Sequence, residues 1–114
     1  MEVRATQHDH VTVLVIAGSV DSLTADQLTA ALTEHVGAGR VRLVTDFSAV
    51  DYTSSAGLRS LLGALKDSRR LGGDLRMACL QPSVRRVLTL SGFSSIVQIF
   101  DDAASAIASY GAEA

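Results

Sequence analysis

Hydroxyl side chains gather in one short stretch of this sequence, residues 48–55, immediately before a helical pattern. Four of the eight residues in SAVDYTSS are serine or threonine. A hydroxyl at a helix start can cap the unpaired backbone N–H groups, and it can also carry a phosphate, whose negative charge suits the positive end of the helix dipole. Two roles therefore stay open for Ser54 and Ser55: an ordinary cap, or a phosphate acceptor.

A phosphate in this stretch would act mainly on a protein docked against it. The group adds a charge of about −1.5 to −2, close to the acidic side chains of Asp21 and Asp51. Desolvating that charge under a partner is expected to cost on the order of 3 kcal/mol, which is roughly a hundredfold in affinity. The helix start itself tolerates an anion. If a phosphate is added here, it would act as a switch that controls reversible docking, and the ordinary cap remains the alternative.

Apolar periodicity divides the rest of the chain into strands and helices. The run VTVLVIA is too short for a core helix and suits a strand covered on both faces. Leucines at i, i+3, i+4 and i+7 predict a helix that begins near Ser54 or Ser55 and ends at Gly72. The only cysteine, Cys79, is expected to be an inert thiol in a buried strand. Strands are predicted at residues 2–6, 11–17, 41–47, 75–80 and 96–100.

Residues with strong capping preferences mark the ends of the other helices. Thr24 and Gln27 have the spacing of a capping box, and Gly37 is placed to end that helix in a left-handed conformation. Proline fits the first turn of a helix because it lacks the N–H that would be unpaired there. The remaining predicted boundaries are Pro82 and Gly92 for a third helix, and Asp101 or Asp102 for a C-terminal helix lined by Ala103, Ala106, Ile107 and Tyr110.

The predicted order of elements, β-β-α-β-α-β-α-β-α, indicates an α/β fold. Its sheet is expected to be mixed and mostly parallel, with about five strands and four helices. No linker or repeat interrupts the pattern, so residues 1–114 are expected to form a single domain. Functional loops of such sheets collect outside the carboxyl ends of the parallel strands. Residues 18–22, 48–55 and 81–82 are predicted to meet there, which brings Asp21 close to Ser54 and Ser55.

Composition argues against several classes of function. A formal charge of −2 and the absence of tryptophan leave no basic, stacking surface for nucleic acid. The first residues contain no apolar segment of signal-peptide or membrane-spanning length, which predicts a cytoplasmic protein without a membrane partner. His8 and His10 lack a third ligand for a metal, and no nucleophile elbow or phosphate-binding glycine pattern is complete. We expect no catalytic residues, no metal and no cofactor, and a monomer when free.

Three stretches of the chain resemble one protein family. The segment VDYTSSAGLRSLL, residues 50–62, resembles the signature loop and helix of STAS domains, specifically those of bacterial anti-sigma factor antagonists. Residues 18–21, GSVD, resemble that family's Gly-x-hydrophobic-Asp turn, and residues 72–93 resemble its fourth strand and third helix. The order and length of the predicted elements match across nearly the whole chain. The resemblance implies a STAS-like fold.

The same resemblance implies a partner and a modification. In such proteins the signature is Asp-Ser-Ser-Gly-Leu or Asp-Ser-Ala-Gly-Leu, and a partner anti-sigma factor with serine kinase activity phosphorylates a serine in it. The unphosphorylated antagonist binds that kinase, which releases a sigma factor, and phosphorylation ends the binding. Ser55 falls on the serine of the second form, with Gly57 and Leu58 on its Gly-Leu. Ser54 occupies the aspartate position and is the reserve acceptor, and Ala56 replaces the second serine of the first form.

A docking surface can also be predicted. Arg59, Gly63, Lys66 and Arg70 recur at helical spacing opposite the leucines, as either a basic ridge that meets a partner or a solvated face. The alternative function is a scaffold or adaptor domain with a fixed interface, for example the cytoplasmic part of a lipid-transport or signalling complex. The predicted partner contacts are Asp21, Ser22, Asp51, Tyr52, Thr53, Ser54, Ser55, Ala56, Gly57, Arg59 and Gly63.

Overall fold

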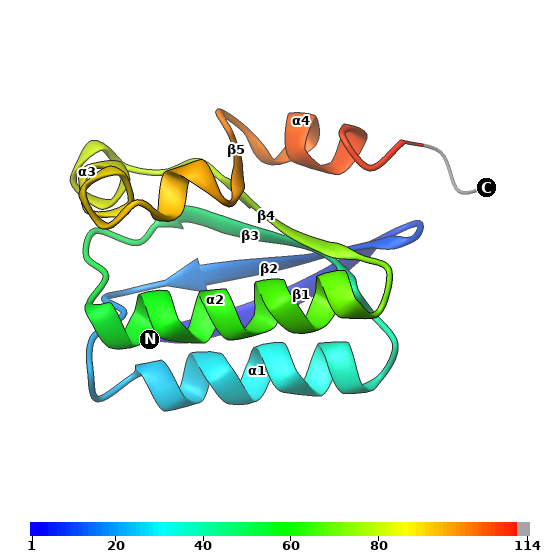
Figure 1. Cartoon of the computed structure of the whole chain (residues 1–114), viewed down its shortest axis with the longest axis horizontal. Helices are drawn as coiled ribbons and strands as arrows, with labels where there is room; N and C mark the ends of the chain where they lie inside the picture. Colours follow the sequence, from blue (N-terminus) through cyan, green and yellow to red (C-terminus); the bar gives the residue numbers. More distant parts are fainter. Residues whose placement is uncertain (112–114) are drawn as a thin grey trace.

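Five strands form one mixed sheet in which they lie in sequence order (Figure 1). The computed structural model describes residues 1–111, so the last three residues of the predicted domain lie outside the described part. One antiparallel pairing joins the first two strands, and every later pairing is parallel, which confirms the predicted sheet. The strands are β1 (Glu2–His8), β2 (Val11–Ala17), β3 (Arg42–Ala49), β4 (Asp74–Ala78) and β5 (Gln98–Phe100).

Helices cover both faces of this sheet. α1 and α2 lie side by side on one face, and α4 lies on the other (Figure 1). The predicted order of strands and helices is confirmed, with one addition, the short 3-10 helix η1. No helix within residues 1–111 is both long enough and apolar enough to cross a lipid bilayer. The helices are α1 (Ala25–Gly37), α2 (Ser55–Arg70), α3 (Pro82–Ser91), η1 (Phe93–Ser95) and α4 (Ala103–Ala108).

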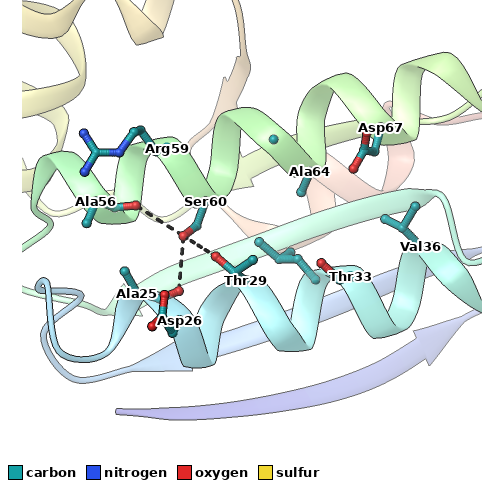
Figure 2. Close-up of a pocket in the computed structure, with 12 residues that line it drawn as sticks. Ala25, Asp26, Thr29, Thr33, Val36, Ala56, Arg59, Ser60, Ala64 and Asp67 are labelled. Atoms are coloured by element: carbon teal, nitrogen blue, oxygen red, sulfur yellow. Dashed lines mark hydrogen bonds between the residues drawn. The ribbon is translucent and has the colours of Figure 1, made fainter.

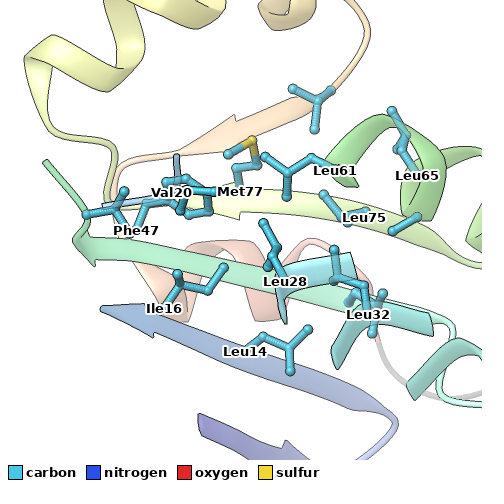
Figure 3. Close-up of a cluster of buried hydrophobic side chains, with 14 of the residues drawn as sticks. Leu14, Ile16, Val20, Leu28, Leu32, Phe47, Leu61, Leu65, Leu75 and Met77 are labelled. Atoms are coloured by element: carbon cyan, nitrogen blue, oxygen red, sulfur yellow. The ribbon is translucent and has the colours of Figure 1, made fainter. Parts of the chain in front are cut away.

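Two apolar clusters, one on each face, hold the layers together. Side chains alternate between the two faces along a strand, so the unbroken apolar run of β2 supplies both clusters. Leu14 and Ile16 join the larger cluster, under α1 and α2, whereas Val11 and Val13 join the smaller one, under α4. The larger cluster also contains Leu28, Leu32, Phe47, Leu61, Leu65, Leu75 and Met77 (Figure 3).

Several predicted boundaries are wrong, each for a local reason. The strand predicted at 75–80 ends at Ala78, because Cys79 adopts a left-handed backbone with φ of 63° and is only half-buried. The strand predicted at 96–100 begins at Gln98, because the N–H groups of the two preceding residues bond back to the Phe93 carbonyl at η1 instead of pairing in the sheet. The strand predicted at 41–47 runs instead over Arg42–Ala49.

The cap predictions at the two ends of α1 also need correction. Gly37 lies inside the helix, whose hydrogen bonds continue through Ala38, and the left-handed residue is Gly39 with φ of 86°. Thr24 occupies the N-cap position, but its hydroxyl bonds no helical N–H, so the capping box does not form. The left-handed Gly92 at the end of α3 is confirmed.

Tyr110 lies just beyond the C-terminal helix, rather than on it as predicted. Its hydroxyl is 2.7 Å from the carbonyl oxygen of Leu43 and 2.8 Å from that of Asp74, and the Arg76 guanidinium lies 3.9 Å from the centre of its ring. Burial raises the pKa of Tyr110 and keeps the hydroxyl protonated. This contact fastens the C-terminal segment to the amino ends of β3 and β4.

We expect the protein to lose stability when the solution is acidified below about pH 6.5, the ordinary pKa of histidine. The Nδ1 atom of His35 accepts a hydrogen bond from Arg40 Nε at 2.8 Å, and burial, together with the Arg40 cation, lowers the pKa of His35. As the pH falls, the imidazole of His35 is therefore protonated in the unfolded chain before it is protonated in the folded protein. Protonation then favours the unfolded state, so the stability that is present above the ordinary pKa of histidine is lost below it. Urea unfolding at pH 7.5 and 5.5 measures the effect.

The His35→Gln protein should show a smaller difference between the two pH values. His8→Gln is the matched control because this imidazole lies on the exposed strand β1. A pH dependence that is the same in all three proteins would contradict the assignment to His35.

Candidate functional site

Three loops meet at the carboxyl edge of the parallel strands, as the sequence predicts. A parallel bridge joins Val20 to Thr53: the Val20 N–H donates to the Tyr52 carbonyl at 2.9 Å, and the Ser54 N–H donates to the Val20 carbonyl at 2.7 Å. From the first turn of α3, directly after the third loop, Ser83 Oγ donates to the Asp51 carbonyl at 3.0 Å. We call the surface formed by residues 18–22, 48–55 and 81–83 the loop edge.

The two serines at the start of α2 have different environments. Ser54 is the N-cap residue, with φ of −95° and ψ of 172°, and its Oγ accepts a hydrogen bond from the Gly57 N–H at 3.3 Å. Ser55 is the first residue of the helix and is exposed, and its hydroxyl makes no hydrogen bond among those of residues 1–111. The capping role therefore belongs to Ser54, and the hydroxyl of Ser55 is free at the surface.

Asp21 organises the loop beside these serines. Its Oδ1 accepts hydrogen bonds from the N–H groups of Leu23 and Thr24, at 2.9 and 3.0 Å. Desolvation raises the pKa of Asp21, but these hydrogen bonds outweigh it and hold the pKa below its ordinary value. The carboxylate therefore stays ionised. Asp21 is next in sequence to Val20, whose carbonyl accepts the hydrogen bond from the Ser54 N–H.

Two of the predicted partner contacts lie beneath the surface instead. Thr53 is 2% exposed and Gly57 is buried, so neither offers a side chain to a docked protein. A Cβ atom on Gly57 would lie 2.6 Å from Val20 Cγ1 and 2.7 Å from Thr53 Oγ1. These residues support the loop edge from below, and the glycine allows the helix to approach it.

The other predicted contact residues do reach the surface. Asp21, Ser54 and Ala56 are half-buried, and the rest of the set is exposed, namely Ser22, Asp51, Tyr52, Ser55, Arg59 and Gly63. The sequence interpretation missed two hydroxyls of the loop edge, Ser19 and Ser83. Ser19 Oγ donates to Asp51 Oδ1 at 3.2 Å, and Ser83 reaches the same residue's carbonyl. Ser83 could have been found, because it directly follows residues 81–82, which were predicted to lie here, and belongs to the first turn of α3.

A groove lies between α1 and α2, with Ala25 and Ala56 among the residues that line it (Figure 2). Its volume is about 330 Å³, and Gly63, which has no side chain, is one of the residues that line it. The two helices are joined here by a hydrogen bond between Ser60 Oγ of α2 and Thr29 Oγ1 of α1, which lie 2.6 Å apart. Arg59, Asp26 and Asp67 also line the groove, so this surface carries both signs of charge rather than a purely basic ridge.

Fold and loop edge together define the class of protein. A mixed sheet in sequence order, two helices packed side by side on one face and a serine-rich loop leading into the second of them are the features of a STAS domain. The STAS domain family matches residues 2–106 of this chain. The chain therefore belongs to the STAS domain family.

Similar proteins support this assignment. BtrV of Bordetella bronchiseptica, to which the role of anti-sigma factor antagonist is ascribed, is 36% identical over 110 residues, with 96% of this chain and 95% of BtrV covered. The anti-sigma-F factor antagonist RsfB of Mycobacterium tuberculosis is 31% identical over 100 residues, covering 86% of this chain and 80% of RsfB. The crystal structure of an anti-sigma factor antagonist from Mycobacterium paratuberculosis superimposes with a TM-score of 0.87 at 26% identity, covering 95% of this chain and 92% of the other.

Proposed function

We propose that this protein is an anti-sigma factor antagonist that docks onto a kinase-type anti-sigma factor and is released when Ser55 is phosphorylated. The observation that carries the proposal is the position of the Ser55 hydroxyl. It is exposed at the first residue of α2, where the three loops of the loop edge meet. Two relatives that match most of the chain, BtrV and RsfB, are named as anti-sigma factor antagonists, which supports the antagonist part of the proposal.

The charges of the loop edge support release by phosphorylation. Two carboxylates, of Asp21 and Asp51, belong to the loops that meet the start of α2. A phosphate on Ser55 would add a charge of about −1.5 to −2 to this surface. Exposed charges are stable in water, but a docked partner would remove that water and leave the charges uncompensated. The penalty therefore falls on the complex and not on the folded domain.

The direct test is phosphoryl transfer. The purified protein is incubated with Mg-ATP and each kinase-type anti-sigma factor of the source genome, and intact mass is measured. We expect a gain of one phosphate in the wild type and in Ser54→Ala, and none in Ser55→Ala. Ser54→Ala is the matched control, since it removes the neighbouring hydroxyl and about 1 kcal/mol of capping. A partner that binds the wild type tightly yet adds no phosphate would rule out the switch and favour a fixed scaffold.

A further inference from the structure

Arg59 lies one helical turn beyond the proposed phosphate acceptor. Residues i and i+4 of a helix are neighbours on its surface, with about 5–6 Å between their Cβ atoms, and long side chains lean toward the helix N-terminus. Figure 2 shows the guanidinium of Arg59 extending back along α2 toward the turn that holds Ala56. Arg59 is therefore placed to reach a group attached to Ser55.

The guanidinium of Arg59 is also available for a new partner. The ion pairs formed within residues 1–111 involve Arg69, Arg70, Arg76 and Arg85, and Arg59 belongs to none of them. The first turn of α2 contains no acidic residue that could compete.

The carboxylates of the groove and of the loop edge do not form an ion pair with Arg59 within residues 1–111. Asp26 lines the same groove from α1 but does not pair with Arg59. On the loop edge, Asp21 already accepts two backbone N–H groups, and Asp51 accepts the Ser19 hydroxyl. A phosphate on Ser55 would be the most strongly charged acceptor within reach of this side chain.

Arg59 occupies a central place on the face that a partner would cover. It lines the groove between α1 and α2, and it also lines a second, more apolar depression of about 240 Å³ formed with Leu62, Phe93 and Ile96. A cation between two concave surfaces favours a partner that carries an acidic group. If the Arg59 guanidinium turned away from the partner, this face would lose a positive charge even without any movement of the backbone.

We propose that Arg59 binds the phosphate carried by Ser55 and is thereby withdrawn from an acidic group of the docked anti-sigma factor. This inference rests on the proposed function. A guanidinium presents paired donors that match phosphate oxygens, so the pair forms within one helix turn. Phosphorylation then has two effects on the charge of the face that a partner would cover: it adds the negative charge of the phosphate, and it neutralises the positive charge of Arg59.

The test installs phosphoserine at position 55 during translation, so no kinase is needed. Phosphorus NMR then follows the second ionisation of the phosphate as a function of pH. We expect the pKa of the phosphate to be lower in the otherwise wild-type protein than in Arg59→Gln by about 0.5 to 1 unit, a three- to tenfold change in its acid dissociation constant. Arg59→Lys should retain most of the difference, because it keeps the positive charge.

Lys66→Gln is the matched control for loss of one charge from the same helix. Lys66 is exposed and eleven residues beyond Ser55, about 16 Å along the helix axis, which exceeds the screening length of about 10 Å at 0.1 M salt. The phosphate on residue 55 of the Lys66→Gln protein should therefore titrate as it does in the otherwise wild-type protein. Equal pKa values in wild type and Arg59→Gln, or an equal shift in Lys66→Gln, would overturn the pairing, provided that circular dichroism shows all variants folded.

A binding measurement tests the consequence for the partner. Phosphoserine at position 55 should reduce affinity for the anti-sigma factor by a smaller factor in Arg59→Gln than in the wild type, because the variant has no guanidinium to withdraw. An equal factor in both would overturn the second half of the inference. Failure of every kinase to modify Ser55 would instead refute the proposed function and leave the titration result standing.

Discussion

The Ser55→Glu protein is expected to bind its anti-sigma factor partner on the order of a hundredfold more weakly than the wild type, about 3 kcal/mol, while remaining folded. The added carboxylate lies on the loop edge, which already carries Asp21 and Asp51. It also lies at the positive end of the α2 dipole, where an anion contributes about 0.3 to 1 kcal/mol in favour of the fold. Isothermal titration calorimetry and urea unfolding separate the two effects.

Two companion variants sharpen this prediction. Ser55→Ala should bind as the wild type does and should keep its affinity after treatment with kinase and ATP. Ser105→Glu adds the same charge at an exposed position of α4, on the opposite face of the sheet, and should leave binding unchanged. Equal weakening by Ser55→Glu and Ser105→Glu would show that net charge, rather than the loop edge, governs the complex.

Gly57→Ala is expected to destabilise the protein by about 2 to 3 kcal/mol, although alanine is the better helix former. The added methyl group would meet Val20 Cγ1 at 2.6 Å and Thr53 Oγ1 at 2.7 Å, and both of these side chains are buried in the support of the loop edge. Relief requires the start of α2 to move away from the first loop. Urea unfolding measures the loss, and partner affinity should fall with it.

Gly63→Ala provides the matched control on the same helix. No atom of residues 1–111 lies within 4 Å of a Cβ atom at this position, which is exposed. The substitution should therefore stabilise the helix by about 0.5 to 1 kcal/mol through the lower entropy of the unfolded chain. If Gly57→Ala were as stable as Gly63→Ala, the close approach of α2 to the loops would have no energetic importance.

Much of the loop edge follows from the sequence, because it depends on strand polarity. Parallel strands place their carboxyl ends at one edge, so the loops after β2, β3 and β4 had to meet wherever those strands are neighbours. The continuous apolar run of β2 already indicated a strand with both faces covered. The contact between the Val20 and Ser54 segments is thus a consequence of topology rather than of any particular side chain.

Local choices between similar residues could not be predicted in the same way. Ser54 and Ser55 have equal chemistry, and only the point at which the backbone becomes helical decides which one caps the helix. Gly37 and Gly39 are equally able to adopt a left-handed backbone, but α1 includes Gly37 as its last residue, and the left-handed turn comes two residues later. The depth of Thr53 depends on the approach of α2, which is a property of the packed structure.

The two ends of the described chain leave the fold on opposite sides. Met1 lies at the loop edge: its carbonyl accepts a hydrogen bond from Gln27 Nε2 at 3.1 Å, and its Cα is 3.3 Å from the point that a Cβ on Gly18 would occupy. Tyr110 is fastened at the far end, beside Leu43 and Asp74. A purification tag or fluorescent label placed before Met1 would therefore crowd the loop edge, whereas Tyr110 holds the other end of the described chain at the opposite end of the sheet.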